Sequence, residues 1–368
     1  MIKRLMASML LLGIAVSMSF SPLFAQDVKK KKLILIAGRK SHGYGQHSFK
    51  AGCSLLKKAL DENVPGLETI LVLDGWPADE SILDSADGIC IYSDGGGGHP
   101  YNAHLEKIDA LAKKGVGLAM FHYGVETTKG KNGDKFLDWI GGYFEPNWSV
   151  NPHWRLSDSE LAKNHPITRG VNPFKTHDEW YYHMRFRPKM EGVTPILSAL
   201  PPSETLVNKD GKLSRGDGPH SNNPFVREAV LDRKEKQVLA WACDRADGGR
   251  GFGYTGGHSH WNWGNDNNRK MILNSLAWIC KVEVPSMGVN SKRPTLMELR
   301  ENMDYPVPDK FDFAKIEKDL EESNKSANTS IIQDPIISII QDPITSTSPR
   351  LKKIWKNRTR EHGLFRAR

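Results

Sequence analysis

Histidines recur in this chain at the ends of predicted strands. The chain holds 13 histidines among 368 residues, and four of them lie at such positions. These are His42 after a strand at 32–37, His99 after 86–93, His122 at the end of 115–122, and His258 after 250–255. Because parallel strands present their carboxyl ends at one edge of a sheet, where such proteins bind ligands, we expect these imidazoles to share a site.

A further group of polar and aromatic residues lies at 176–183, in the run THDEWYYH. Its Asp178 and Glu179 would bring carboxylates to the imidazoles. Histidine and carboxylate together can bind a divalent metal such as zinc, or move protons near neutral pH. The same residue types, with aromatic rings, also line sugar sites. We expect substrate contacts from Asp94, His99, Trp180, Tyr181 and Trp261.

Other catalytic chemistries have weaker support in the sequence. The turn 122–124 follows a strand as a nucleophile elbow does, but its first residue is histidine rather than serine or cysteine. All four cysteines lie outside CxxC pairs and in apolar settings, so we expect small buried hydrophobes. The glycine run 95–98 has neither the phosphate-loop lysine nor the G-x-G-x-x-G spacing, so no nucleotide cofactor is expected.

Alternating strands and helices must position these residues. The pattern over 32–122 predicts a parallel sheet with right-handed crossovers. Residues 130–235 predict an elaborated middle segment of short strands and long loops, after which the α/β pattern returns at 237–280. We therefore predict one domain over 32–284. Residues 285–368 have few apolar clusters and predict an irregular or disordered tail, whose removal should leave the fold intact.

The two ends of the chain carry its basic character. The net charge is +8, of which residues 1–32 contribute +5 and residues 350–368 contribute +7, so the remainder carries −4. A mildly acidic core argues against a nucleic-acid partner. Residues 1–25 combine a basic start with an apolar run too short to span a bilayer, as a cleaved signal peptide does. We expect export to the periplasm or the exterior, without a stable membrane span.

Several motifs in the same order resemble the trehalose-utilisation ThuA-like family. They are KLILIAG, GVGLAMFHYG, NHPITRGV followed by THDEW, and GRGFGYTGGHSHW, and together they cover roughly residues 32–284. The resemblance implies a flavodoxin-like α/β fold, similar to class I glutamine amidotransferases but without their cysteine, with helices on both faces of the sheet. It also implies a role with disaccharides or their keto forms. The residues that match the family pattern are His42, His122, Asp178, Glu179 and His258.

Two hypotheses follow from these residues. In the first, the protein is an exported enzyme that acts on a disaccharide or keto-sugar. His42, His122 and His258 would bind Zn²⁺ or Mn²⁺, His122 would also take part in the chemistry, and Asp178 or Glu179 would move a proton. In the second, it is a non-catalytic sugar-binding module. The sequence leaves open whether the chain forms a homo-oligomer.

Overall fold

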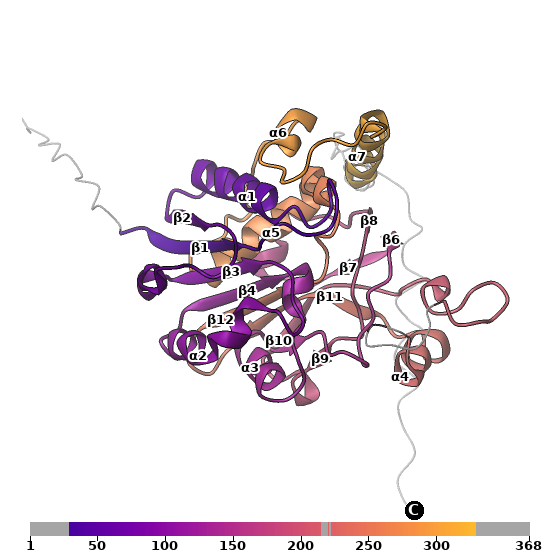
Figure 1. Cartoon of the computed structure of the whole chain (residues 1–368), viewed down its shortest axis with the longest axis horizontal. Coiled ribbons are helices and arrows are strands. Elements are labelled where there is room, and N and C mark those ends of the chain that lie inside the picture. The colour runs from indigo at the N-terminus through magenta and orange to yellow at the C-terminus, as the bar shows by residue number, and fades with distance from the viewer. Residues whose placement is uncertain (1–28, 215–219, 221, 329–368) are drawn as a thin grey trace, which may run out of the picture. The chain divides into compact units, whose positions relative to one another are not determined.

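A largely parallel sheet organises the chain (Figure 1). The structure, a computed structural model, describes residues 29–214, 220 and 222–328. Within them the main sheet has eight strands, in the spatial order β2 (Leu67–Val72), β1 (Lys31–Ala37), β3 (Gly88–Tyr92), β4 (Gly117–Phe121), β12 (Arg250–Tyr254), β11 (Gln237–Asp244), β10 (Val193–Ala199) and β7 (Ser159–Leu161).

The strand directions define the fold class. Strands β2, β1, β3, β4 and β12 are parallel, whereas β11, β10 and β7 each pair antiparallel with the preceding neighbour. The parallel part has the flavodoxin-like order, with β12 as the fifth strand. The predicted flavodoxin-like α/β fold is therefore confirmed.

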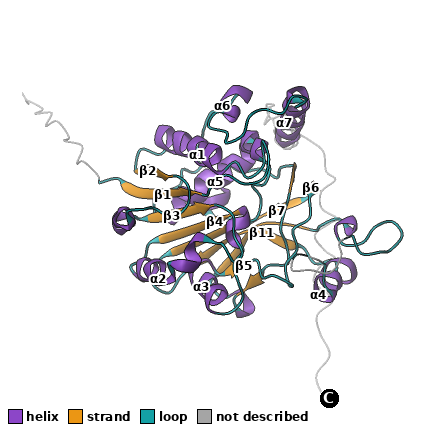
Figure 2. Cartoon of the chain, in the orientation of Figure 1, coloured by secondary structure: helices purple, strands orange, loops and turns teal. Residues whose placement is uncertain are grey.

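Helices cover both faces of this sheet, which explains the uninterrupted apolar runs of its strands. Leu33 and Leu35 of β1 point into one buried cluster, and Ile34 and Ile36 point into the other. The first cluster lies against α1 (Phe49–Asn63) and α5 (Asp266–Ile279), and the second against α2 (Leu105–Lys113) and α3 (Lys131–Ile140). Figure 2 shows the helices on either side of the strands.

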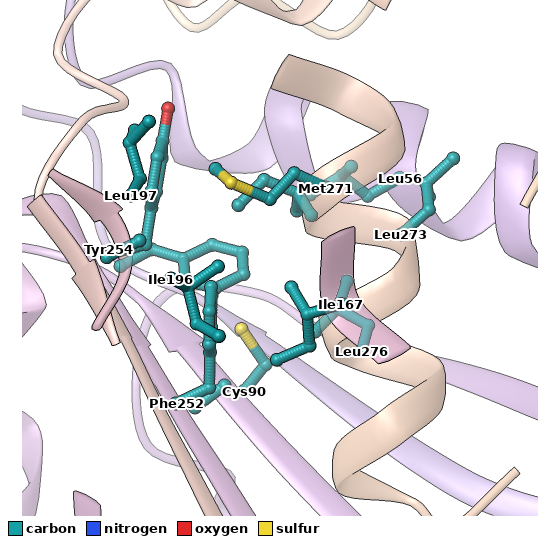
Figure 3. Packing of buried hydrophobic residues seen from close by; sticks show 14 of the residues in the cluster. Leu56, Cys90, Ile167, Ile196, Leu197, Phe252, Tyr254, Met271, Leu273 and Leu276 are labelled. Carbon is teal, nitrogen blue, oxygen red and sulfur yellow. The ribbon is translucent and has the colours of Figure 1, made fainter. Parts of the chain in front are cut away.

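The cluster beneath α1 and α5 also holds three of the thiols. Figure 3 shows Cys90 among Leu56 of α1, Leu276 of α5 and Phe252 of β12. Cys53, Cys90, Cys243 and Cys280 are all buried and free. The prediction that the cysteines act as small buried hydrophobes is confirmed, and none of them stands at the candidate site.

The middle segment is elaborated, as predicted, but it also contains a helix. Helix α3 begins at Lys131, inside the stretch that the sequence predicted to be short strands and loops. Two small antiparallel sheets follow, which pair β5 (Gly142–Tyr143) with β9 (Arg185–Phe186) and β6 (Trp154–Leu156) with β8 (Thr176–Asp178). A short helix, α4 (Pro224–Arg227), comes later. Strand β8 leads directly into the acidic residues of the site.

Residues 285–328 differ from the irregular tail that the sequence predicted. They contain α6 (Leu296–Arg300) and α7 (Phe313–Asn328). Leu299 of α6 is fully buried, and its carbonyl oxygen accepts a hydrogen bond from His260 Nε2 at 2.8 Å. The prediction failed because these amphipathic segments bury a few apolar side chains against the domain rather than forming a core of their own. Residues 329–368 lie outside the described residues.

The N-terminal prediction concerns residues that the structure does not describe. The expected signal peptide, 1–25, lies outside the described residues. Across 29–214, 220 and 222–328, no helix combines the length and the apolar character needed to cross a membrane.

Candidate metal centre

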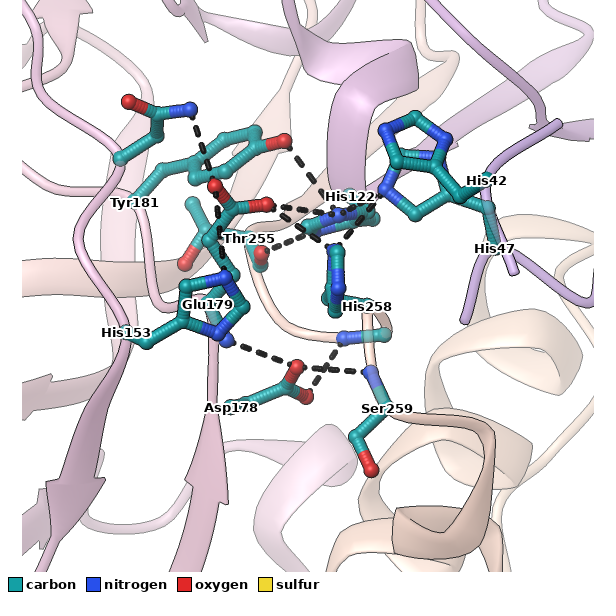
Figure 4. A network of polar contacts seen from close by, with 12 residues as sticks. His42, His47, His122, His153, Asp178, Glu179, Tyr181, Thr255, His258 and Ser259 are labelled. Atoms are coloured by element: carbon teal, nitrogen blue, oxygen red, sulfur yellow. Dashed lines mark hydrogen bonds and ion pairs between the residues drawn. The ribbon is translucent and has the colours of Figure 1, made fainter. Parts of the chain in front are cut away.

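Four loops bring three imidazoles and a carboxylate together in a buried cluster (Figure 4). His47 comes from the loop between β1 and α1, His122 from the end of β4, Glu179 from just after β8, and His258 from the loop after β12. Each of the four is buried, and one side-chain donor atom from each lies within 4.8 Å of the others. We call His47, His122, Glu179 and His258 the buried cluster.

The donor atoms converge closely. His47 Nε2 lies 3.0 Å from His122 Nε2 and 3.0 Å from His258 Nδ1. Glu179 Oε2 lies 3.0 Å from His258 Nδ1 and 3.5 Å from His122 Nε2. Two ligand atoms of tetrahedral zinc, at bonds of about 2.05 Å, are about 3.3 Å apart. The cluster therefore has the spacing of a first coordination shell.

The backbone holds two of these histidines in an uncommon conformation. His122 has φ of +52° and His47 has φ of +41°. A non-glycine residue in the left-handed region costs roughly 1–3 kcal/mol and persists only where the surrounding structure enforces it. At His122 this gives the sharp turn that the elbow-like pattern predicted. At His47, a hydrogen bond joins the loop after β1 to the loop after β12, because His47 N donates to His258 O at 3.1 Å.

The outer ring nitrogens identify where the imidazole protons lie. His122 Nδ1 is 3.0 Å from the carbonyl oxygen of Thr255, which can only accept, so this nitrogen carries the proton. His47 Nδ1 is 2.8 Å from Asp94 Oδ1, a carboxylate oxygen, and donates likewise. In neutral rings both Nε2 atoms then carry lone pairs and lie 3.0 Å apart, with Tyr181 Oη and His258 Nδ1 as the possible donors within reach of them. A cation between them removes the repulsion between these lone pairs.

Burial and hydrogen bonding support these proton positions. Burial lowers the pKa of His122 well below its ordinary value and, partly offset by Asp94, lowers the pKa of His47. Burial alone would raise the pKa of Asp94, but the hydrogen bond from His47 brings it below the ordinary value. Neutral imidazoles whose second nitrogen donates to a carboxylate or a carbonyl are the usual metal-ligating form of histidine.

Glu179 is ionised, and its two carboxylate oxygens face different ways. Oε2 lies among the imidazole nitrogens, whereas Oε1 points away from them. Burial acts to raise the pKa of Glu179, yet its contact with His258 and the nearby imidazoles brings the value below its ordinary one. Oε1 accepts a hydrogen bond from Asn151 Nδ2 at 3.0 Å and lies 3.9 Å from His153 Nε2. The side chain of His153 is 47% exposed, so this neighbour of Glu179 reaches the surface of the protein.

Asp178 has a positioning role in the structure, which differs from the predicted proton transfer. Its two carboxylate oxygens accept backbone hydrogen bonds from Gly257 at 2.8 Å and from Ser259 at 2.9 Å. They also accept from the Asn262 side chain at 2.9 Å and from Glu179 N at 2.9 Å. With both oxygens engaged and the side chain buried, Asp178 fixes the loop that carries His258.

His42 lies at the rim of the site rather than among the buried donors. Its ring stacks on that of His47 with centroids 3.5 Å apart, and its side chain is 40% exposed. His42 Nδ1 lies 3.9 Å from Asp94 Oδ1, so His42, His47 and Asp94 form a second, more open set of donors. The structure therefore places His47 where the sequence analysis placed His42.

The predicted substrate-binding residues fall into two groups. Tyr181 reaches the cluster, with Oη 3.3 Å from His122 Nε2, and Asp94 borders it through His47. Trp180 and Trp261 do not present a surface to a ligand, because both are buried, whereas the equally buried His99 belongs to the lining of a separate cavity. Trp180 packs on Tyr254, Trp261 packs against aromatic rings before α7, and His99 donates to a main-chain carbonyl.

Sequence reasoning assigned no role to three residues of the site. His47 was noted at the end of the run after the first strand and at the start of a helix, and His153 was noted as a further histidine of the middle segment. Asn151 was not singled out, because it lies in the segment without periodicity. The available signal was the histidine pair in the loop after β1, since only one of the two can point inward.

The fold and the buried cluster define a flavodoxin-like α/β protein with the imidazole of His122, rather than a cysteine or serine, at the turn after β4. The family model described as ThuA, trehalose utilisation, matches residues 34–279. The chain belongs to this family, which links it to carbohydrate utilisation.

The solved structures that are similar to this chain include two ThuA-like proteins. A ThuA-like protein from Bacteroides uniformis has 15% sequence identity, covers 70% of this chain and 95% of its own, and gives a TM-score of 0.47. A ThuA-like protein from Parabacteroides merdae has 13% identity, covers 74% and 100%, and gives a TM-score of 0.44. None of the curated proteins matches the chain in sequence.

Proposed function

We propose that the protein is an exported enzyme that acts on a disaccharide or its keto form, with a divalent cation such as Zn²⁺ or Mn²⁺ held by His47, His122 and His258. Glu179 would be the group that moves a proton. The observation that carries this proposal is the pair of unprotonated Nε2 atoms on His47 and His122, 3.0 Å apart with both outer nitrogens committed elsewhere.

The side chains of the buried cluster suit a divalent cation. Three imidazole nitrogens leave a coordination position for substrate, as catalytic zinc sites do. When bound, the cation would act as a Lewis acid toward a sugar carbonyl or hydroxyl oxygen. The same donors would accept Mn²⁺, so the residues alone support a divalent cation of either kind.

The residues around the cation position divide the remaining tasks. Glu179 is ionised and can accept a proton from the carbon next to a sugar carbonyl, or from a hydroxyl group. Asn151 holds Glu179 Oε1 at 3.0 Å, which fixes the direction of the carboxylate. Tyr181 Oη, 3.3 Å from His122 Nε2, is placed to donate a hydrogen bond to a substrate oxygen. Asp178 holds the loop that carries His258 in place by accepting hydrogen bonds from Gly257 N and Ser259 N.

Export remains part of the proposal because of the composition of residues 1–25. Edman sequencing of the protein recovered from an exporting host tests it. A mature chain that begins near Gln26 supports export, whereas a retained Met1 in the cytoplasmic fraction contradicts it.

Replacing Glu179 with glutamine tests the catalytic part. Glu179→Gln keeps the shape but cannot accept the proton, so turnover should fall by roughly 10²–10⁴-fold with the bound metal retained. Turnover of disaccharides and their keto forms is followed by chromatography. Glu160→Gln, at an exposed ion pair with Lys236, is the matched control.

The metal content and the turnover of these proteins distinguish a base from a metal ligand at Glu179, and an enzyme from a sugar-binding module. Loss of the metal from Glu179→Gln would make Glu179 a ligand rather than the base. If wild-type protein binds the sugars and never changes them, the enzyme proposal fails and the non-catalytic sugar-binding alternative replaces it.

A further inference from the structure

A cavity of about 520 Å³ lies next to the buried cluster and is not used by the chemistry proposed above. It is formed by the loops that follow β1, β2 and β3, at 38–40, 74–76 and 93–104. These loops lie on either side of the point where the strand order reverses, between β1 and β3. Open α/β sheets bind ligands in this crevice, and the volume is that of a small-molecule site.

Asp94 connects the cavity to the buried cluster. Its carboxylate lines the cavity and accepts the hydrogen bond from His47 Nδ1 at 2.8 Å. His47 Nε2, on the opposite side of the same ring, faces the cation position. The His47 ring therefore lies between Asp94 and the cation position, so the cavity and the buried cluster are adjacent.

The cavity contains an aromatic ring in a fixed orientation. Trp76 lines it, and the ring of His104 stacks on the indole at 4.0 Å with 9° between the planes. Glu80 Oε1 accepts from Trp76 Nε1 at 2.8 Å and lies 3.0 Å from His104 Nδ1. Because the side chains of His104 and Glu80 hold the indole, little conformational entropy is lost when a ligand packs on it.

The charges that line the cavity cancel. Arg39 and Lys40 are matched by Asp74 and Asp94, so an anionic ligand would meet two carboxylates as well as two cations. Gly97 leaves its backbone open, since a Cβ there would meet nothing within 4 Å. Paired acids and bases around an aromatic ring suit a neutral molecule with many hydroxyl groups.

We infer that this cavity is a second sugar subsite, which binds the distal ring of a disaccharide on Trp76 while the reacting ring lies at the buried cluster. The inference rests on the proposed function and specifies its substrate class, namely neutral disaccharides rather than monosaccharides or sugar phosphates. Asp74, which follows β2 with φ of +61°, would accept hydrogen bonds from the distal hydroxyl groups.

Calorimetric titration of the purified protein with trehalose, methyl α-glucoside and trehalose 6-phosphate tests this inference. Trehalose should bind more tightly than the other two. Trp76→Ala should weaken trehalose binding by about tenfold, through loss of the stacking surface, and leave methyl α-glucoside binding and metal content unchanged. Phe225→Ala, which removes an exposed ring that does not line the cavity, should leave trehalose binding unchanged.

A second variant guards against a folding defect. Asp74→Asn removes the charge while asparagine tolerates the left-handed backbone, and it should also weaken trehalose binding. The inference is overturned if trehalose binds no better than methyl α-glucoside, if the phosphate binds best, or if both variants bind trehalose like wild type.

Failure of the subsite and failure of the enzyme proposal give different results. If sugars are turned over but Trp76→Ala and Asp74→Asn have no effect, the subsite is wrong and the enzyme proposal stands. If trehalose binding depends on Trp76 but no sugar is changed, the subsite stands and the enzyme proposal is wrong.

Discussion

At the scale of single residues, the hydrogen-bond partners of a side chain separate ligands from supports. His47 and His122 each have one nitrogen committed outward and one unprotonated nitrogen turned inward. Asp178, although it is adjacent to Glu179, has both oxygens occupied by the loop after β12. Residue type alone could not distinguish Asp178 from Glu179, because the distinction lies in which way each carboxylate points.

Asp178→Asn tests the positioning role. Asparagine keeps one accepting oxygen and adds two donors opposite backbone N–H groups, so the His258 loop loses charged hydrogen bonds. We expect a destabilisation of about 2 kcal/mol in urea unfolding and a 10–100-fold loss of metal affinity, as for other residues that orient ligands. Metal affinity equal to that of wild type would contradict this role.

At the scale of elements, α6 is held by one fully buried side chain, so it offers a direct test of whether residues 285–328 belong to the domain. Leu299→Ala should lower the free energy of unfolding by roughly 2–5 kcal/mol, because it leaves a cavity against the loop before α5. Met297, on the same helix, is 77% exposed, and Met297→Ala should change the value by less than about 0.5 kcal/mol. Equal changes in the free energy of unfolding for the two variants would contradict the packing of α6 on the domain and would favour the predicted irregular tail.

The sequence predicted the elements whose burial pattern is local. Strand β1 was predicted within one residue of its observed bounds, 31–37, because it is a continuous apolar run. Helix α3 was missed since its buried Phe136, Trp139 and Ile140 follow a glycine-containing first turn. Helices α6 and α7 were missed because the surfaces they pack against come from residues far away in the chain.

At the scale of the whole molecule, the site depends on the completed sheet. Its four donors span residues 47 to 258 and come from four separate loops, so no single segment of the chain contains the centre. Sequence reasoning could identify the strand ends that meet, but it chose His42 rather than His47 as the ligand from the loop after β1. Only the packing of the loop after β1 against the loop after β12 turns His47 inward.

The stability of the whole molecule should fall in mild acid. Burial lowers the pKa of His99 from 6.5 to about 4. Between these values the unfolded chain binds a proton that the folded chain excludes. Folding stability contributed by neutral His99 is therefore present above pH 6.5 and is lost as the pH falls toward 4, by about 3 kcal/mol in all.

Urea unfolding of His99→Gln between pH 7 and pH 4 measures this contribution. Glutamine keeps a donor for the Gly124 carbonyl but does not titrate, so the variant should show a shallower loss of stability than wild type. Parallel pH profiles for the two proteins would show that His99 is not the group responsible.

Metal content of the purified protein tests the central proposal most directly. The account predicts about one divalent ion per chain in wild type. The ion should be retained in His42→Ala and in the control His165→Asn, which replaces a histidine outside the cluster, and lost from His47→Ala and His122→Ala. Wild-type protein that is free of metal and fully active would contradict the account.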